Sequence, residues 1–127
     1  MSIFDHISIK VGDSVAMNAF YKAALAPLGV TQKFLVERTE GLIGGNGREQ
    51  VNFFVAQATS AAEAGIHLAF VAGSKAEVDT FYAAAIAAGG QDNGPPGVRA
   101  KFHESYYEAF IIDPDGNNVE AAFQRPE

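Results

Sequence analysis

Apolar and polar positions alternate over two short stretches of the chain, residues 6–11 and residues 66–71. A period of two is typical of a strand that buries one face. In both stretches a histidine, His6 or His67, lies on the face opposite the bulky aliphatic row. This pattern predicts two strands, each with one face under a helix and the other lining a cleft.

Each of these strands is followed by apolar residues at helical spacing, over 17–28 in the first half and 78–86 in the second. Apolar residues three and four positions apart form one buried face of a helix, so we predict a helix in each place. Residues that start and end helices flank both: the N-cap candidates are Asp13 or Ser14, and Ser74 with Glu77, and the left-handed C-terminal candidates are Gly29 and Gly90.

Shorter apolar runs follow both predicted helices. Residues 89–97 are rich in Gly, Pro, Asn and Asp and are expected to form a loop, and residues 113–117 are expected to form a tight turn. The predicted strands cover residues 32–38, 41–45 and 50–57 in the first half, and 98–104, 107–113 and 117–123 in the second. Each half is therefore predicted to have the order β-α-β-β-β, which makes the chain an α+β protein.

The two halves also repeat each other in sequence. At an offset of 61 residues, eight of the 25 positions from His6 to Val30 are identical, and His6 falls on His67. A repeat of this kind is typical of one structural unit used twice. With 127 residues in total, the chain is expected to be a single domain, 1–127, made of two modules at about 1–60 and 61–127.

Composition narrows the class of function. Nine Lys and Arg residues against fifteen Asp and Glu give a net charge of −6, so we expect no nucleic-acid partner and no binding to an anionic membrane. The chain has no cysteine, which excludes thiol chemistry and leaves histidine and carboxylate as the strong metal ligands. We recognise neither a signal peptide nor an apolar run of roughly 20 residues, and therefore expect a cytoplasmic location.

Three residues are candidates for a metal site. His6 and His67 occupy matching positions of the repeat, and Glu120 lies on a predicted strand whose apolar neighbours point to the opposite face. Two imidazoles and one carboxylate form a facial triad for a divalent metal, with positions left open for substrate or water. This spacing is not a local ligand motif, so the triad has meaning only if the two halves close around a shared cleft. The alternative is that each histidine is simply accommodated on its strand.

Two groups of residues form wider motifs. They are Phe4-Asp5-His6-Ile7, Phe20-Tyr21 and Leu28-Gly29 near the start, and Tyr106-Tyr107-x-Ala109-Phe110-x-x-Asp113-Pro114-Asp115-Gly116-Asn117-x-Val119-Glu120 near the end. Together they resemble the vicinal oxygen chelate superfamily, the group of glyoxalases, bleomycin resistance proteins and extradiol dioxygenases. The resemblance implies two tandem βαβββ modules forming a curved mixed sheet around a cleft, with the helices on the outer face. It also implies that His6, His67 and Glu120 bind one divalent metal ion. Fe(II), Mn(II), Ni(II) and Zn(II) all accept this ligand set.

One position departs from the pattern of glyoxalase I. Members that resemble this enzyme use a fourth ligand, usually Glu, on the last strand of the first module, and the corresponding residue here is Asn52. Asn52 is therefore a candidate for a weak oxygen ligand, for a substrate contact, or for a merely polar position. His103 and Tyr107 are further candidates for substrate contact or proton transfer; the alternatives are a surface histidine and a packed tyrosine. Because Tyr106 and Tyr107 are adjacent, only one of them points inward in an extended segment.

Two functions are consistent with these observations. The first is a divalent-metal enzyme of lyase, isomerase or dioxygenase type, in which the metal acts as a Lewis acid on a small substrate that binds through two oxygens. The second is a metal-free protein that binds or sequesters a small molecule, as bleomycin resistance proteins do. The resemblance also suggests a homodimer, with a cleft either within one chain or shared between two.

Overall fold

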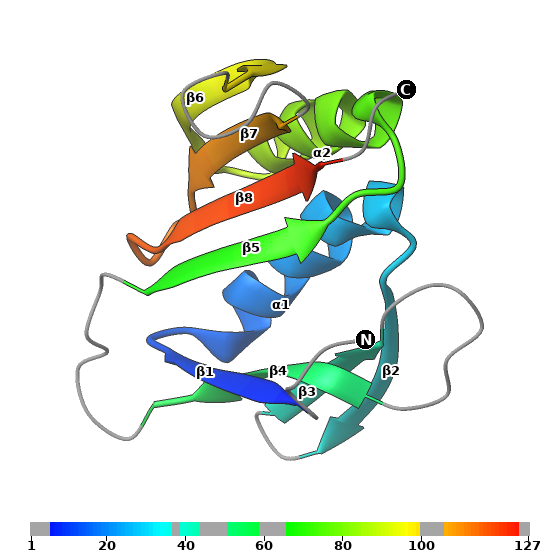
Figure 1. Cartoon of the computed structure of the whole chain (residues 1–127). Coiled ribbons are helices and arrows are strands. Elements are labelled where there is room, and N and C mark those ends of the chain that lie inside the picture. The colour runs from blue at the N-terminus through cyan, green and yellow to red at the C-terminus, as the bar shows by residue number, and fades with distance from the viewer. Residues whose placement is uncertain (1–5, 37–38, 44–50, 59–65, 100–105, 125–127) are drawn as a thin grey trace.

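The computed structural model of the chain describes residues 6–36, 39–43, 51–58, 66–99 and 106–124 (Figure 1). The first half contains β1 (Ile7–Val11), α1 (Ser14–Leu25), the 3₁₀ helix η1 (Ala26–Leu28), β2 (Thr31–Val36), β3 (Thr39–Ile43) and β4 (Val51–Gln57). The second half contains β5 (His67–Val71), α2 (Lys75–Ala87), β6 (Gln91–Val98), β7 (Tyr107–Ile112) and β8 (Asn118–Phe123). The order β-α-β-β-β therefore occurs twice, and the predicted α+β class with two βαβββ modules is confirmed.

Each module has its own four-stranded sheet, and the two sheets share one topology. The strand orders are β1-β4-β3-β2 and β5-β8-β7-β6. In each sheet the first strand is parallel to the last strand of the module, and the remaining pairs are antiparallel. Helix α1 packs on the first sheet, α2 packs on the second, and the two helices contact each other (Figure 1). Each sheet therefore has one face covered by the helix of its own module.

Both helices begin at N-cap residues that the sequence predicts, Asp13 and Ser74. The Asp13 carboxylate accepts a hydrogen bond from the amide of Ala16 at 3.1 Å, and the Ser74 hydroxyl accepts one from the amide of Glu77 at 3.1 Å. These bonds satisfy amide groups that have no partner within the first turn of a helix. In the part of the chain that is described, neither helix has the length and apolar character needed to cross a membrane.

The two matching glycines at the helix ends have different roles. Gly29 adopts the left-handed conformation, with φ of 80°, as predicted. The same prediction for Gly90 is wrong, because the residue with positive φ is its neighbour Gly89, at 110°. Gly90 is required by a close approach instead, since a Cβ there would lie 2.9 Å from the carbonyl oxygen of Ala85. Matching positions of the repeat therefore both carry glycine, but for different structural reasons.

The segment richest in turn-forming residues is a strand. The loop predicted over residues 89–97 is wrong, since β6 lies there and pairs antiparallel with β7. As the last strand of its sheet, β6 needs amide donors on one side only, and its register shifts on both sides of Gly94. An irregular edge strand of this kind tolerates proline. The strand predicted over 98–104 falls mainly on residues that are not described.

One cluster of buried apolar side chains extends across both modules. The Phe53 ring of β4 makes edge-to-face contacts with Tyr21 of α1 and with Phe70 of β5, each with 5.3 Å between ring centroids. The Tyr21 hydroxyl in turn donates a hydrogen bond to Asp113 Oδ2 at 2.5 Å, in the turn between β7 and β8. Burial and the charge of Asp113 raise the pKa of Tyr21 well above its usual range, so this hydroxyl remains a donor. Tyr21 and Asp113, which both belong to the sequence motifs, thus join the two modules.

Candidate functional site

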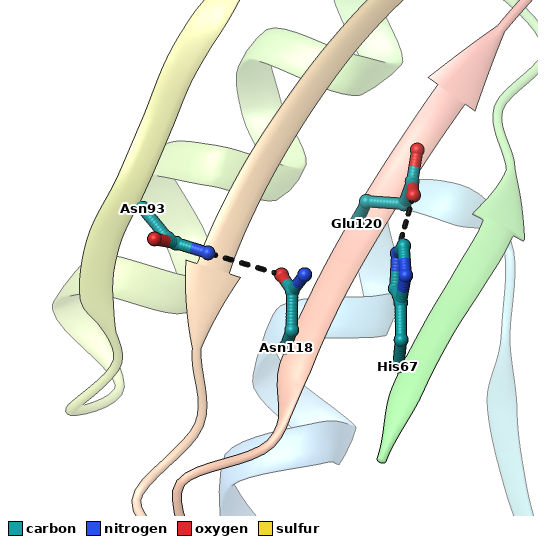
Figure 2. Close-up of polar contacts among 4 residues, drawn as sticks. All are labelled: His67, Asn93, Asn118 and Glu120. Atoms are coloured by element: carbon teal, nitrogen blue, oxygen red, sulfur yellow. Dashed lines mark hydrogen bonds and ion pairs between the residues drawn. The ribbon is translucent and has the colours of Figure 1, made fainter. Parts of the chain in front are cut away.

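Two of the predicted metal ligands meet on one face of the second sheet, the face opposite α2. Strands β5 and β8 are parallel neighbours with Ala69 opposite Glu120, so His67 and Glu120 project from the same face. His67 Nε2 lies 2.6 Å from Glu120 Oε1 (Figure 2). The His67 side chain is 53% exposed and the Glu120 side chain only 5%. The imidazole is therefore open to solvent, and the carboxylate beneath it is covered.

Glu120 has a second oxygen without a hydrogen-bond partner. Oε2 is buried, and as long as Glu108 is ionised it has no hydrogen-bond partner within the described part of the chain. A buried carboxylate oxygen without a partner is costly, so an additional group is expected beside it. Imidazole nitrogen and carboxylate oxygen are ligands that divalent transition metals and zinc accept together. The pair therefore fits two positions of a metal site with two histidines and one carboxylate.

A second carboxyl group, which the sequence pattern did not single out, lies beside Glu120. Glu108 of β7 pairs with Ala122 of β8, which places it on the same face as Glu120, and the residue is 2% exposed. Burial, a hydrogen bond to Glu120 and the charge of Glu120 raise the pKa of Glu108 to about 7. A hydrogen bond to Tyr106 and the charge of Arg99 lower this pKa. Glu108 therefore holds a proton next to Glu120 up to near-neutral pH.

The two adjacent tyrosines at the start of β7 point to opposite faces. The Tyr107 hydroxyl donates to Asp79 Oδ1 of α2 at 2.6 Å, so this side chain lies on the helix side of the sheet. Tyr106 lies on the other side, where burial and the charges of Glu108 and Glu120 raise its pKa. The placement predicted for Tyr107 is thereby corrected, because alternation along a strand lets only one of the pair face Glu120. That residue is Tyr106.

The third predicted ligand, His6, is not part of this group. It directly precedes β1 in the first sheet, and its ring contacts Phe54 of β4 edge-on at 5.6 Å between centroids. Within the described ranges, no three His, Asp or Glu side chains are placed to hold one metal ion together. One chain therefore brings His67 and Glu120 together and leaves His6 apart from them.

The remaining candidates are placed only by their position in the chain. Asn52 lies in β4, where the register with β3 shifts: Val51 pairs with Ile43 and Phe53 with Leu42, so Asn52 is the extra residue of the irregularity. His103 lies outside the described residues.

Further polar groups extend across the sheet from His67. Asn118 of β8 is the register partner of His67, and its Oδ1 accepts a hydrogen bond from Asn93 Nδ2 of β6 at 3.2 Å. Figure 2 shows this amide pair and the His67–Glu120 pair over the same face. Neither asparagine was identified from the sequence. Together with Glu108 and Tyr106, the amides surround the histidine–carboxylate pair with groups that donate and accept hydrogen bonds.

The paired βαβββ fold of this chain is shared with a known protein family. The model of the Glyoxalase/Bleomycin resistance protein/Dioxygenase superfamily matches residues 3–121. The chain therefore belongs to this superfamily. A search of curated proteins gave no match.

Several solved structures are similar to this chain. A glyoxalase/bleomycin resistance protein from Albidiferax ferrireducens T118 is 30% identical with a TM-score of 0.84, over 96% of this chain and 99% of that one. A glyoxalase/bleomycin resistance protein/dioxygenase family enzyme from Burkholderia phytofirmans PsJN is 20% identical with a TM-score of 0.72, over 95% and 98% of the two chains. The fosfomycin resistance protein FosX from Mesorhizobium loti is 17% identical with a TM-score of 0.70, over 98% and 94%. The last two share the fold alone.

Proposed function

We propose that the protein is a divalent-metal enzyme whose small substrate binds through two oxygen atoms. The observation that carries this proposal is the His67–Glu120 pair, 2.6 Å apart, in which one buried carboxylate oxygen has no partner among the described residues. His6 completes the ligand set from a second copy of the chain in a homodimer, since the described part of one chain does not bring the three residues together. The reaction is of lyase, isomerase or dioxygenase type.

The side chains around the pair have separate roles in this proposal. A divalent ion bound there would supply Lewis-acid polarisation of a substrate oxygen. Glu108 holds a proton beside Glu120, because burial and the neighbouring carboxylate raise its pKa to about 7. Tyr106 remains protonated, because burial and the charges of Glu108 and Glu120 raise its pKa, and its hydroxyl is hydrogen-bonded to Glu108, where it orients that carboxyl beside the metal ligands. Asn52 and His103 are further candidates for substrate contact and proton transfer.

Metal content tests the proposal directly. Protein purified without an affinity tag or a chelator is analysed for bound divalent metals, and the same measurement is made on His67→Ala and on His103→Ala. We expect metal in the wild type and a loss of at least about tenfold in metal affinity for His67→Ala, because one of three ligands is removed. His103→Ala is the matched control, since it also deletes one imidazole. It should retain the metal.

Two outcomes separate the alternatives. Equal metal content in the wild type and His67→Ala would refute the proposed site. If the wild type also shows no stabilisation by added Mn²⁺, Ni²⁺ or Zn²⁺ in thermal unfolding, the protein is better described as a metal-free module that binds small molecules. Binding of the metal to a protein that retains its fold stabilises it by mass action, so this second measurement is independent of turnover.

A further inference from the structure

A cationic side chain lies near the His67–Glu120 pair on the same face of the second sheet. The guanidinium carbon of Arg99, which directly follows β6, is 5.7 Å from the centre of the Phe110 ring. Phe110 is the register partner of Glu120 across β7 and β8, and its ring centroid is 6.3 Å from that of His67. One aromatic side chain therefore separates Arg99 from the proposed metal ligands.

Strand β6 is shaped to hold this guanidinium. A Cβ on Gly94 would lie 3.2 Å from Arg99 Nη2 and 3.1 Å from the Phe110 ring, and a Cβ on Gly97 would lie 3.0 Å from Arg99 Nη1. Arg99 Nη2 also donates a hydrogen bond to the carbonyl oxygen of Pro95 at 2.7 Å. The ring on one side and the backbone of β6 on the other fix the plane of the guanidinium. A planar fork held in this way loses little further entropy when it binds a ligand.

The hydrogen bond to Pro95 uses only one of the N–H groups of Arg99. A guanidinium has five such donors, and within the described ranges its side chain makes no other hydrogen bond or ion pair. When a divalent ion is bound, its charge and that of Arg99 together exceed the charges of Glu108 and Glu120. The loaded face is then net positive and attracts an anion.

We propose that Arg99 binds an oxyanion of the substrate, such as a carboxylate, while the metal receives two other oxygens of the same molecule. This inference rests on the proposed metal function and names its substrate class: a small molecule that combines a pair of vicinal oxygens with a separate anionic group. The arrangement makes Arg99 a specificity-determining residue. It also disfavours cationic ligands on this face of the loaded protein.

Two matched chelators test the inference. Acetohydroxamic acid offers a pair of vicinal oxygens, and N-hydroxysuccinamic acid offers the same pair with an added carboxylate. Calorimetric titration into the full chain saturated with Ni²⁺ gives the ratio of their dissociation constants. We expect the carboxylated chelator to bind about tenfold more tightly, because a guanidinium–carboxylate contact is a charge-assisted, bidentate hydrogen bond. In Arg99→Gln this ratio should fall to about one, and in Arg99→Lys to an intermediate value, because the charge remains but the fork is lost.

Lys22→Gln is the charge-matched control. Lys22 is an exposed residue in the last turn of α1, and its removal should leave the preference unchanged. The inference is overturned if the wild type has no preference for the carboxylated chelator, or if Arg99→Gln keeps it. If acetohydroxamic acid binds equally well with and without Ni²⁺, the proposed metal function fails and the inference falls with it. Metal-dependent binding of acetohydroxamic acid without a preference for the added carboxylate overturns the inference alone.

Discussion

At the scale of single residues, the most unusual feature is a buried pair of carboxyl groups. Glu108 and Glu120 are 2% and 4% exposed, and when both are ionised each has one oxygen without a hydrogen-bond partner in the described structure. Two carboxylates in a buried site do not both ionise readily, because desolvation and mutual repulsion favour the protonated form of one. The metal-free protein therefore carries a proton on this pair that the unfolded chain would release at lower pH.

We predict that Glu108→Gln changes how the stability of the metal-free protein depends on pH. The pKa of Glu108 is raised from 4.5 to about 7 in the folded state, so the folded protein binds the proton more tightly than the unfolded chain between these values. Stability from this group is therefore greatest at low pH and is lost as the pH rises through 7. Glutamine does not ionise, so the variant should gain stability relative to the wild type between pH 5 and pH 8.

Urea denaturation in the presence of EDTA measures this change at the two pH values. The measurement at pH 5 is the reference, because Glu108 is then still neutral in the folded state, like glutamine, although in the unfolded chain, where its pKa is 4.5, it is already mostly ionised. A stability difference between variant and wild type that is the same at both pH values contradicts the prediction.

At the scale of secondary-structure elements, the turn between β7 and β8 ties the second module to the first. Asp113 Oδ1 accepts hydrogen bonds from the amides of Asp115 and Asn117 within the turn, at 2.9 Å and 2.8 Å. Its other oxygen accepts from the Tyr21 hydroxyl of α1. The amide of Gly12, between β1 and α1, donates to the Asp115 carboxylate at 3.2 Å. The aspartates of this motif therefore have a structural role in joining the modules.

We predict that Tyr21→Phe destabilises the protein by about 2 kcal/mol, because a buried hydrogen bond to a charged acceptor typically contributes about 1.5–3 kcal/mol. The repeat provides a matched control in Tyr82→Phe. Tyr82 occupies the equivalent position of α2 but is only half-buried, and its hydrogen-bond partner Asp92 is exposed. Equilibrium urea denaturation should show a markedly smaller loss for Tyr82→Phe. Equal losses in the two variants would show that the Tyr21–Asp113 contact contributes nothing specific.

At the scale of the whole molecule, the repeat places its two histidines on different sheets. His67 stands beside Glu120 in the second sheet, and His6 contacts Phe54 in the first. Among the strands that the structure describes, β1 and β5 each have one hydrogen-bonded neighbour, and exposed strand edges favour association with another copy. A site shared between two subunits is therefore the arrangement of the three ligands that we propose.

Mixing two defective variants tests this shared site. We expect His6→Ala and Glu120→Ala each to bind little metal alone, because each homodimer lacks a ligand in both sites. In a mixed dimer, one site receives His6 from one subunit and His67 with Glu120 from the other, so it is intact. Metal content of the refolded mixture should therefore exceed that of either variant. A mixture that stays free of metal, although mass spectrometry shows mixed dimers, contradicts a shared site.

Much of the local structure could be predicted from the sequence because it depends on short-range patterns. Alternation of apolar residues located β1 and β5, and Asp13 and Ser74 marked the helix starts. Local pattern failed at β6, where long-range pairing with β7 overrides the turn-forming composition. It also missed Glu108, although Glu108 alternates with buried apolar neighbours in the same way as Glu120.

The sequence by itself determined the two βαβββ modules and the faces on which His67 and Glu120 stand, because a strand's alternation fixes which side chains share a face. Only the tertiary structure decided that these two side chains touch, since the register of β5 against β8 depends on residues more than fifty positions apart. It also decided that His6 is held apart from them, and that Glu108 and Arg99 lie beside the pair. Such neighbours are set by packing between strands, which no local periodicity specifies.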